Sequence, residues 1–291
     1  LDATRDIVRQ FIASRPHMRL IEQPRPGIAP SRNLGLQQAR YDYVAFLDAD
    51  CTAEPGWLEA LERTMRDSRD AKPPVAAVGG PSLAPLNTTL FRTAVDVAVR
   101  NFWGHHGSVQ GRLHEKAVSV EHLPTLNVLY DRRPVLAVGG FDEGMHNIGE
   151  DIELSHRLLR GGYALLHVPD AVVRHRWRED PWSWARNMEA YGKGRVWLIL
   201  KHPECFRWQY LAPVLLLAAT VAAPWGLRRP ILAAPLVCYM ILTAAVSLTA
   251  SWRAGRPALA AWVFATYLLT HYSYGIGQIH GLLPRRREGE C

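Results

Sequence analysis

The chain has 291 residues, a formal net charge of +7 at pH 7 and four cysteines. That length suffices for one large domain or two ordinary ones. The cysteines are scattered without a Cys-x-x-Cys pair, which argues against a zinc ribbon and a disulfide scaffold and favours a reducing, cytosol-facing compartment. The basic balance predicts an anionic partner. Because the arginines are dispersed and no nucleic-acid-binding motif is present, we expect no nucleic acid among the partners.

Apolar residues are unevenly spread along the chain. Residues 1–207 have the mixed composition of a soluble α/β domain, whereas residues 208–282 are mostly apolar. Three stretches in the second part approach or reach the roughly 20 residues that a helix needs to cross a bilayer. They are 210–227, 230–250 and 258–279, and a basic tail, 283–291, follows. We expect membrane helices, because a soluble helical bundle needs a polar face that these stretches lack.

The charges that flank the apolar stretches do not orient them. Arginines occur in every connecting segment, so the positive-inside rule favours neither side. The cysteine pattern favours a cytosolic domain. We therefore expect a multi-pass protein of the cell membrane with residues 1–207 on the cytoplasmic side and the lipid bilayer as a partner.

A glycine-containing loop near the start of the chain leads into a helix, at Gly27–Leu36. Ser31, Arg32 and Asn33 fall near the N-terminus of that helix, where backbone N–H groups favour anions. The guanidinium of Arg32 can hold a phosphate through two parallel hydrogen bonds. The alternative, a surface arginine paired with an acid, is equally compatible with the sequence.

The apolar run Val44–Leu47 ends in two carboxylates, Asp48 and Asp50. A short apolar run of this kind predicts a buried strand, and residues two apart on a strand point the same way. Both carboxylates then emerge at the carboxyl end of the strand, where open α/β sheets bind ligands. Paired oxygen ligands suit Mg²⁺ or Mn²⁺ shared with substrate phosphates. The alternative is a simple turn at the end of the strand.

Further strands and helices alternate along the rest of this part, which predicts a mostly parallel sheet with helices on both faces. One helix is predicted within 147–162, and Glu150 and Asp151 fall in its first turn. Carboxylates there complement the helix dipole, but one that faces the ligand edge can also act as a general base. His175 follows a predicted strand, and it is either a metal ligand or phosphate contact, or a structural histidine.

Taken together, these segments resemble the family 2 glycosyltransferases, whose fold is named GT-A. The likeness covers roughly residues 1–200 and rests on five motifs in the right order. They are Gly27…Ser31-Arg32-Asn33-Leu34-Gly35, Phe46-Leu47-Asp48-Ala49-Asp50-Cys51, Val138-Gly139-Gly140-Phe141-Asp142, Gly149-Glu150-Asp151-Ile152-Glu153-Leu154, and Gly161-Gly162-Tyr163 with the strand that ends at His175. No single motif is decisive, but their order is specific.

The resemblance implies a hexosyltransferase that inverts the anomeric centre of a UDP- or GDP-sugar and passes the sugar to a lipid or saccharide hydroxyl. By this resemblance, Asp48 and Asp50, with His175, hold Mn²⁺ or Mg²⁺, and Arg32 and Asn33 contact the donor. Asp151 is implied to be the catalytic base, and Glu150 is implied to support it.

Two departures from the family pattern matter. The family begins with a strand that ends in an acidic nucleotide-binding loop, and we expect that strand to be missing from residues 1–207. No Gln-x-x-Arg-Trp motif is present, which favours transfer of single sugars over polymerisation. Two alternatives remain: a non-catalytic membrane-anchored protein that binds sugars or nucleotides, and another metal-dependent nucleotidyl- or phosphoryltransferase.

Overall fold

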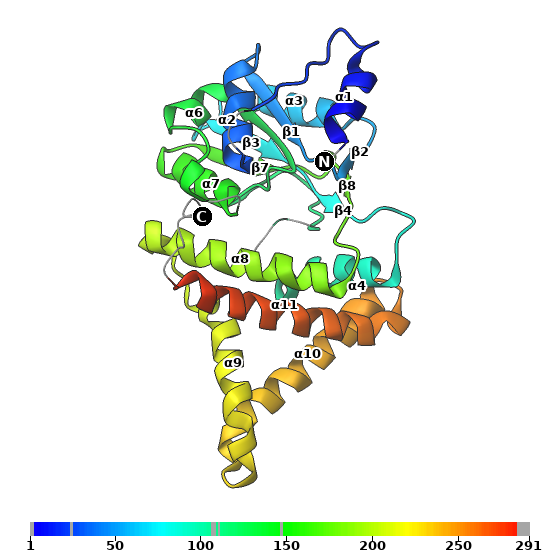
Figure 1. Cartoon of the computed structure of the whole chain (residues 1–291), viewed down its shortest axis with the longest axis vertical. Coiled ribbons are helices and arrows are strands. Elements are labelled where there is room, and N and C mark those ends of the chain that lie inside the picture. Colours follow the sequence, from blue (N-terminus) through cyan, green and yellow to red (C-terminus); the bar gives the residue numbers. More distant parts are fainter. Residues whose placement is uncertain (1–2, 24–25, 106–108, 110, 146–147, 284–291) are drawn as a thin grey trace.

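The structure is a computed structural model that describes residues 3–23, 26–105, 109, 111–145 and 148–283. Figure 1 shows three levels: an α/β part, a layer of long helices beneath it, and an arm of two helices that projects away from both. Most of the predicted basic tail, residues 284–291, lies outside the described residues.

The larger sheet has five strands in the order β1-β6-β3-β7-β5. They are β1 (Tyr43–Leu47), β6 (Asn127–Asp131), β3 (Val75–Gly79), β7 (Ala164–His167) and β5 (Val118–Ser119). β6 runs antiparallel to both of its neighbours, and β5 runs antiparallel to β7. Among the described pairs of this sheet, β3 and β7 alone are parallel. The sheet is therefore mixed, and the expectation of a mostly parallel sheet is wrong, because β6 enters between β1 and β3 in the opposite direction.

A smaller sheet stands beside the end of β1. Its strands are β2 (Cys51–Ala53), β8 (Val173–His175) and β4 (Ser82–Leu83), in the order β2-β8-β4. β2 pairs with β8 antiparallel, so that Cys51 lies opposite His175. The turn from β1 into β2 is closed by a hydrogen bond of 3.0 Å from the backbone N–H of Cys51 to the carbonyl oxygen of Asp48. The chain thus passes directly from the larger sheet to the smaller one through Asp48–Asp50.

Helices cover both faces of the larger sheet, as expected. The helices of the α/β part are α1 (Thr4–Ile12), α2 (Ile28–Gln38), α3 (Trp57–Asp67), α4 (Leu90–Val99), α5 (Phe102–His105), α6 (Arg132–Ala137), the 3-10 helix η1 (Glu143–Met145) and α7 (Glu150–Arg160). One core cluster joins α2, α6 and α7 to the sheet through Leu36, Val135 and Leu154. A second cluster joins α3 through Leu61 and Met65. Full burial of each such side chain contributes about 1.5–3 kcal/mol.

The layer beneath the α/β part is built from α8 (Pro181–Lys201) and α11 (Ala260–Gly281). The two helices lie side by side along their length in Figure 1. Their backbones approach so closely that a Cβ at Gly277 would lie 2.0 Å from the carbonyl oxygen of Glu189, and one at Gly192 would lie 2.1 Å from that of Tyr274. Val263 and Tyr267 of α11 also pack against α4, which lies at the level of this layer in Figure 1.

Two helices among the described residues are long and apolar enough to cross a membrane: Trp208–Gly226 and Ala234–Arg253. The first includes η3 (Trp208–Leu211), α9 (Ala212–Ala222) and most of η4 (Ala223–Leu227), and the second is α10. Only 11% and 17% of their apolar windows are buried, unlike the core helices of a soluble protein. They form the projecting arm in Figure 1, with η5 (Pro230–Leu232) in the turn between them.

The third predicted span, 258–279, falls in η6 (Pro257–Leu259) and α11, and α11 is not one of these two helices. The described residues therefore contain two candidate spans, whereas the sequence predicted three. Several polar residues of α11 are buried, among them Thr270, His271 and Gln278. Trp184 Nε1 of α8 donates a hydrogen bond of 2.9 Å to Thr270 Oγ1. This polar face of α11 therefore contacts other helices of the protein rather than lipid.

Candidate functional site

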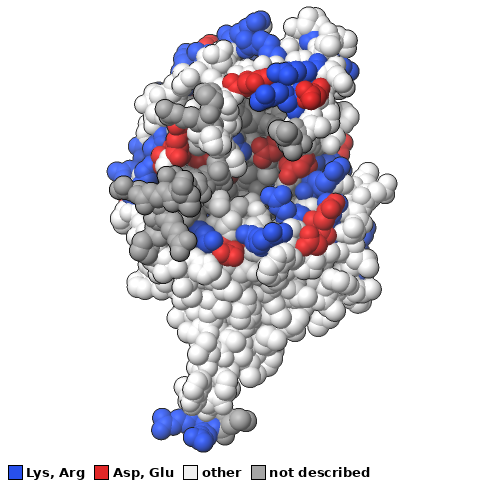
Figure 2. All heavy atoms as spheres, viewed as in Figure 1, with Lys and Arg blue, Asp and Glu red and all other residues white. Residues whose placement is uncertain are grey.

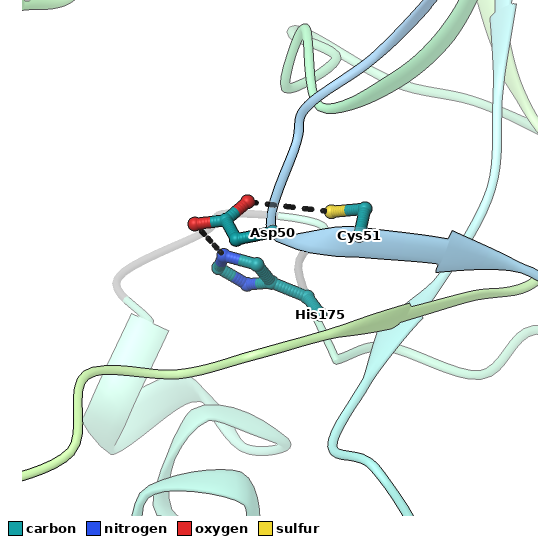
Figure 3. Close-up of side chains that lie close together, drawn as sticks. All are labelled: Asp50, Cys51 and His175. Atoms are coloured by element: carbon teal, nitrogen blue, oxygen red, sulfur yellow. Dashed lines mark hydrogen bonds and ion pairs between the residues drawn. The ribbon is translucent and has the colours of Figure 1, made fainter. Parts of the chain in front are cut away.

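Asp50 and His175 face each other across the junction of the two sheets. Asp50 ends the turn after β1, and the β2–β8 pairing places His175 beside it (Figure 3). Asp50 Oδ2 lies 3.5 Å from His175 Nε2, and Asp50 Oδ1 lies 3.8 Å from Cys51 Sγ. One potential ligand atom from each of Asp50, Cys51 and His175 lies within 4.8 Å of the other two. The expected proximity of Asp50 and His175 is present, and Cys51 is an additional neighbour.

The charges at this junction favour cation binding. The hydrogen bond from His175 holds the pKa of the Asp50 carboxyl below its usual value, so this group stays ionised at neutral pH. Burial, together with the charges of Asp50 and Asp48, raises the pKa of the Cys51 thiol to about 12. The thiol therefore stays protonated and is a poor ligand compared with the carboxylate. His175 Nδ1 is buried and has no hydrogen-bond partner among the described residues.

Arg32 joins the first carboxylate to the start of α7. Its Nη2 donates to Asp48 Oδ1 at 3.3 Å, and its Nη1 donates a short hydrogen bond to Glu150 Oε1. The guanidinium is largely buried, with 12% of the side chain exposed, and it also lies over the ring of Phe141. Asp48 thus faces Arg32, whereas Asp50 faces His175.

Glu150 and Asp151 occupy the first turn of α7, directly after Gly149, which has φ +80° and so adopts the left-handed conformation. Burial raises the pKa of both carboxyls, and the positive charge of Arg32 opposes this increase. Glu150 is almost completely buried, at 5% exposure. A raised pKa makes a carboxylate a stronger base, which is the property that a general base requires.

Asn33 lies close to Arg32 in the chain but makes a different kind of contact. Its Nδ2 donates to the carbonyl oxygen of Phe141 at 2.9 Å, and its Oδ1 accepts from the N–H of Phe141 at 2.8 Å. A Cβ at Gly140 would lie 2.7 Å from Asn33 Oδ1, and Gly140 has φ +71°. Asn33 therefore holds the turn at Gly140–Phe141 in place, rather than pointing toward Asp50. A cavity of about 400 Å³ lies beside this turn and is lined partly by Asn33, but by neither Asp48 nor Asp50.

The sequence interpretation missed Glu153 as the centre of a buried ionic network. This fully buried carboxylate accepts from Arg157 Nε at 2.9 Å and from Lys201 Nζ at 2.9 Å, and it lies 3.0 Å from His202 Nε2. These partners lower the pKa of Glu153 to about 2, against the effect of burial. The i, i+4 spacing from Glu153 to Arg157 was visible in the sequence, but the contacts with the end of α8 were not.

Charged side chains gather around a hollow on one face of the α/β part, whereas the visible face of the arm is uncharged along most of its length (Figure 2). The structure thus brings together Arg32, Asp48 and Glu150 in one linked group and Asp50 with His175 in another. Asp151 follows Glu150 directly, and the charge of Asp48 influences its pKa. Asn33 belongs to neither group.

The chain is similar in sequence to known glycosyltransferases. Residues 1–106 match the family model described as glycosyl transferase family 2. The chain is 32% identical over 199 residues to a pre-mycofactocin glycosyltransferase of Mycobacterium tuberculosis, an alignment that covers 67% of this chain and 40% of that relative. It is 26% identical over 203 residues to a putative polypeptide N-acetylgalactosaminyltransferase 9 of Drosophila melanogaster, covering 65% of this chain and 31% of the relative. The chain thus spans less than half the length of either relative.

A solved structure has the same fold over nearly the whole chain. It is the mannosyltransferase PcManGT from Pyrobaculum calidifontis in complex with GDP-Man and Mn²⁺, with a TM-score of 0.55 and 19% sequence identity. The match covers 93% of this chain and 74% of that one. Together with the order of the motifs, these matches show that the chain belongs to glycosyl transferase family 2 and has a GT-A fold.

Proposed function

We propose that this chain transfers a single sugar from a UDP- or GDP-sugar to a hydroxyl acceptor, with inversion at the anomeric carbon and with Mn²⁺ or Mg²⁺ as cofactor. One observation carries the proposal: Arg32 links Asp48, beside the candidate metal ligands, to Glu150, beside the candidate base. A donor diphosphate and an attacking hydroxyl would therefore meet at one place. The relatives are named glycosyltransferases, which supports the same reaction class.

Asp50 and His175 fit a divalent cation because an ionised carboxylate and an imidazole nitrogen converge there, and Asp48 adds a second carboxylate two residues away. Oxygen-rich sets of this kind suit Mn²⁺ and Mg²⁺. When bound, the cation would neutralise charge on the departing nucleoside diphosphate. Arg32 would contact the diphosphate from the other side, because its guanidinium already lies beside Asp48.

In the proposed reaction Asp151 takes the proton from the acceptor hydroxyl as that oxygen attacks the anomeric carbon. The bond between the sugar and the diphosphate breaks as the new glycosidic bond forms. Glu150 and Arg32 hold the first turn of α7 in position and set the charge around Asp151. In this assignment Asn33 orients the Gly140–Phe141 turn instead of contacting the donor.

The proposed acceptor is a lipid-linked or membrane-associated hydroxyl compound, and the proposed location is the cell membrane with the α/β part on the cytoplasmic side. Exposed apolar side chains cover the arm, among them Leu215, Ile241 and Leu248. In this arrangement α9 and α10 cross the bilayer, and Arg228 and Arg229, in the turn between η4 and η5, reach its far side. α11 remains with α8 at the near surface.

The test is release of nucleoside diphosphate from UDP- and GDP-sugars by membranes that contain the protein, with Mn²⁺ or Mg²⁺ and a lipid extract as acceptor. We expect metal-dependent release that falls by about 10²–10⁴ in Asp151→Asn, the usual size of a general-base contribution. Asp170→Asn is the matched control, because Asp170 is exposed and pairs only loosely with Arg63, at 3.4 Å. Release of pyrophosphate instead would indicate a nucleotidyltransferase, and absence of turnover with retained donor binding would indicate a binding protein.

A further inference from the structure

A second group of metal-ligating side chains lies outside the site described above. His156 on α7, His202 at the end of α8 and Glu204 in η2 (Pro203–Cys205) can bring their ligand atoms within 4.8 Å of one another. His156 Nε2 lies 3.1 Å from Glu204 Oε1, and His202 Nδ1 lies 3.9 Å from the same oxygen. Ligand atoms of tetrahedral zinc are about 3.4 Å apart, given bonds of roughly 2.0–2.2 Å. We propose that His156, His202 and Glu204 bind a Zn²⁺ ion.

The second nitrogen of each imidazole also has a neighbour that fixes the ring. His202 Nε2 lies 3.0 Å from Glu153 Oε1, and His156 Nδ1 lies 3.4 Å from Cys205 Sγ. Histidine ligands of zinc use their second ring nitrogen in this way, which sets the tautomer and the orientation of the ring. Because Glu153 is itself fully buried and held by Arg157, its contact with His202 is well defined. Both candidate histidine ligands are therefore oriented before any ion binds.

The chemistry of the ligands distinguishes this site from the one at Asp50. Two imidazoles and one carboxylate suit zinc, whereas the paired carboxylates of the candidate donor site suit Mn²⁺ or Mg²⁺. Three protein ligands leave the fourth position of a tetrahedral ion to water. The side chains of His156 and His202 are each 17% exposed and that of Glu204 is 44% exposed, so an ion can reach them from solvent.

One neighbouring charge opposes cation binding. Arg160 Nη1 donates to Glu204 Oε1 at 2.5 Å and so competes for a proposed ligand oxygen. The Arg160 side chain is 66% exposed, and exposed ion pairs contribute little to stability, so Arg160 can move into solvent when the ion binds. Replacement of Arg160 by a neutral residue is therefore expected to strengthen zinc binding. Simple loss of local structure would not have that effect.

An ion at this site would connect two parts of the structure. His156 lies on the helix whose first turn carries Glu150 and Asp151, whereas His202 and Glu204 lie at the end of α8, shortly before the chain enters the arm. A bound ion would fasten α7 to this connection. Since a ligand that binds only the folded state stabilises it, zinc is expected to raise the thermal midpoint of the protein.

The experiment uses the full chain in detergent micelles, treated with a chelator and then titrated with Co²⁺ as a spectroscopic probe and with Zn²⁺ as competitor. We expect one bound Co²⁺ to give the visible absorption of a tetrahedral ion, and Zn²⁺ to abolish this absorption. His156→Gln and Glu204→Gln should lose this absorption, and Arg160→Gln should bind more tightly than the wild type. Asp50→Asn and His280→Gln should keep it, because Asp50 belongs to the other site and His280 pairs with Glu189 elsewhere.

Measurements on the same samples can also refute the proposal. Circular dichroism without metal must show that the ligand variants fold, and Glu204→Gln is suited to this because the side chain is partly exposed. Absence of tetrahedral Co²⁺ absorption in the wild type, or its persistence in folded His156→Gln, would refute the site. A thiolate-to-cobalt charge-transfer band that Cys205→Ser removes would refute the proposed ligand set. We expect Cys205→Ala instead to weaken zinc binding by about 10–100-fold, as for other partners of metal-bound histidines.

Discussion

Replacement of Arg32 by Gln would test the electrostatics of the candidate site. Arg32 holds its positive charge beside Glu150, which is 5% exposed, and beside Asp48, whose side chain is 44% exposed. Removal of one partner from a buried ion pair costs about 3–5 kcal/mol, because the other charge is left without compensation. The contact with Asp48 adds little, because solvent screens that carboxylate. We therefore take about 3 kcal/mol as the loss in the free energy of unfolding at pH 8.

The loss should depend on pH, with a sign that follows from proton binding. Arg32 lowers the pKa of Glu150 and Asp151 against the raising effect of burial. Without Arg32 these values rise further above those of the unfolded chain, so the folded variant binds protons that the unfolded chain releases. Stability of Arg32→Gln relative to the wild type should therefore fall as the pH rises from 5 to 8. Each unit of pKa increase corresponds to about 1.4 kcal/mol.

Two assays measure these effects. Thermal unfolding in detergent should show a midpoint that is lower than in the wild type by roughly 6–12 °C at pH 8, for a loss of about 3 kcal/mol, and by less at pH 5. In a plot of turnover against pH, the acidic limb should shift by about 1–3 pH units toward higher pH, because a nearby opposite charge has been removed. Arg32→Lys is the control, because it keeps the charge and should leave the acidic limb near that of the wild type. Equal losses of stability at both pH values, or an unchanged acidic limb in Arg32→Gln, would refute this reasoning.

Two further predictions concern metal binding and helix packing. Asp50→Asn should abolish metal-dependent donor binding, measured by titration of Mn²⁺ and nucleotide, and an unchanged Mn²⁺ affinity would remove Asp50 from the metal site. Gly277→Ala should lower the thermal midpoint, since a Cβ would lie 2.0 Å from the carbonyl oxygen of Glu189 and overpacking typically costs about 1–3 kcal/mol. Gly35→Ala is its control: no atom lies within 4 Å of the added Cβ, and alanine in a helix should stabilise by about 0.5–1 kcal/mol.

The local elements and their chemistry could be predicted from the amino-acid sequence. The apolar run Val44–Leu47 predicted the strand β1, but the expectation that this strand is buried is wrong, because β1 is the edge strand of the larger sheet and none of its residues is buried. The helix predicted within 147–162 is α7, and its Leu158 lies in the core. Glu150 and Asp151 were expected in the first turn of that helix, and they lie there. Two of the three predicted apolar spans are helices that are both long and apolar enough to cross a membrane. These features depend on residues within about two turns or one strand of each other, so a linear pattern contains them.

Contacts between side chains that are distant in the sequence could not be predicted in this way. Arg32 and Glu150 are 118 residues apart, and their contact depends on the packing of α2 and α7 against the same core. The antiparallel pairing of β2 with β8 sets His175 beside Asp50, and the reversed direction of β6 makes the sheet mixed. Two more contacts also depend on segments that are distant in the sequence. Asn33 bonds to the Gly140–Phe141 turn, and α11 packs against α8. Strand direction, register and close helix contact are fixed by pairing between distant segments, and the hydrophobic period of one segment is the same in either arrangement.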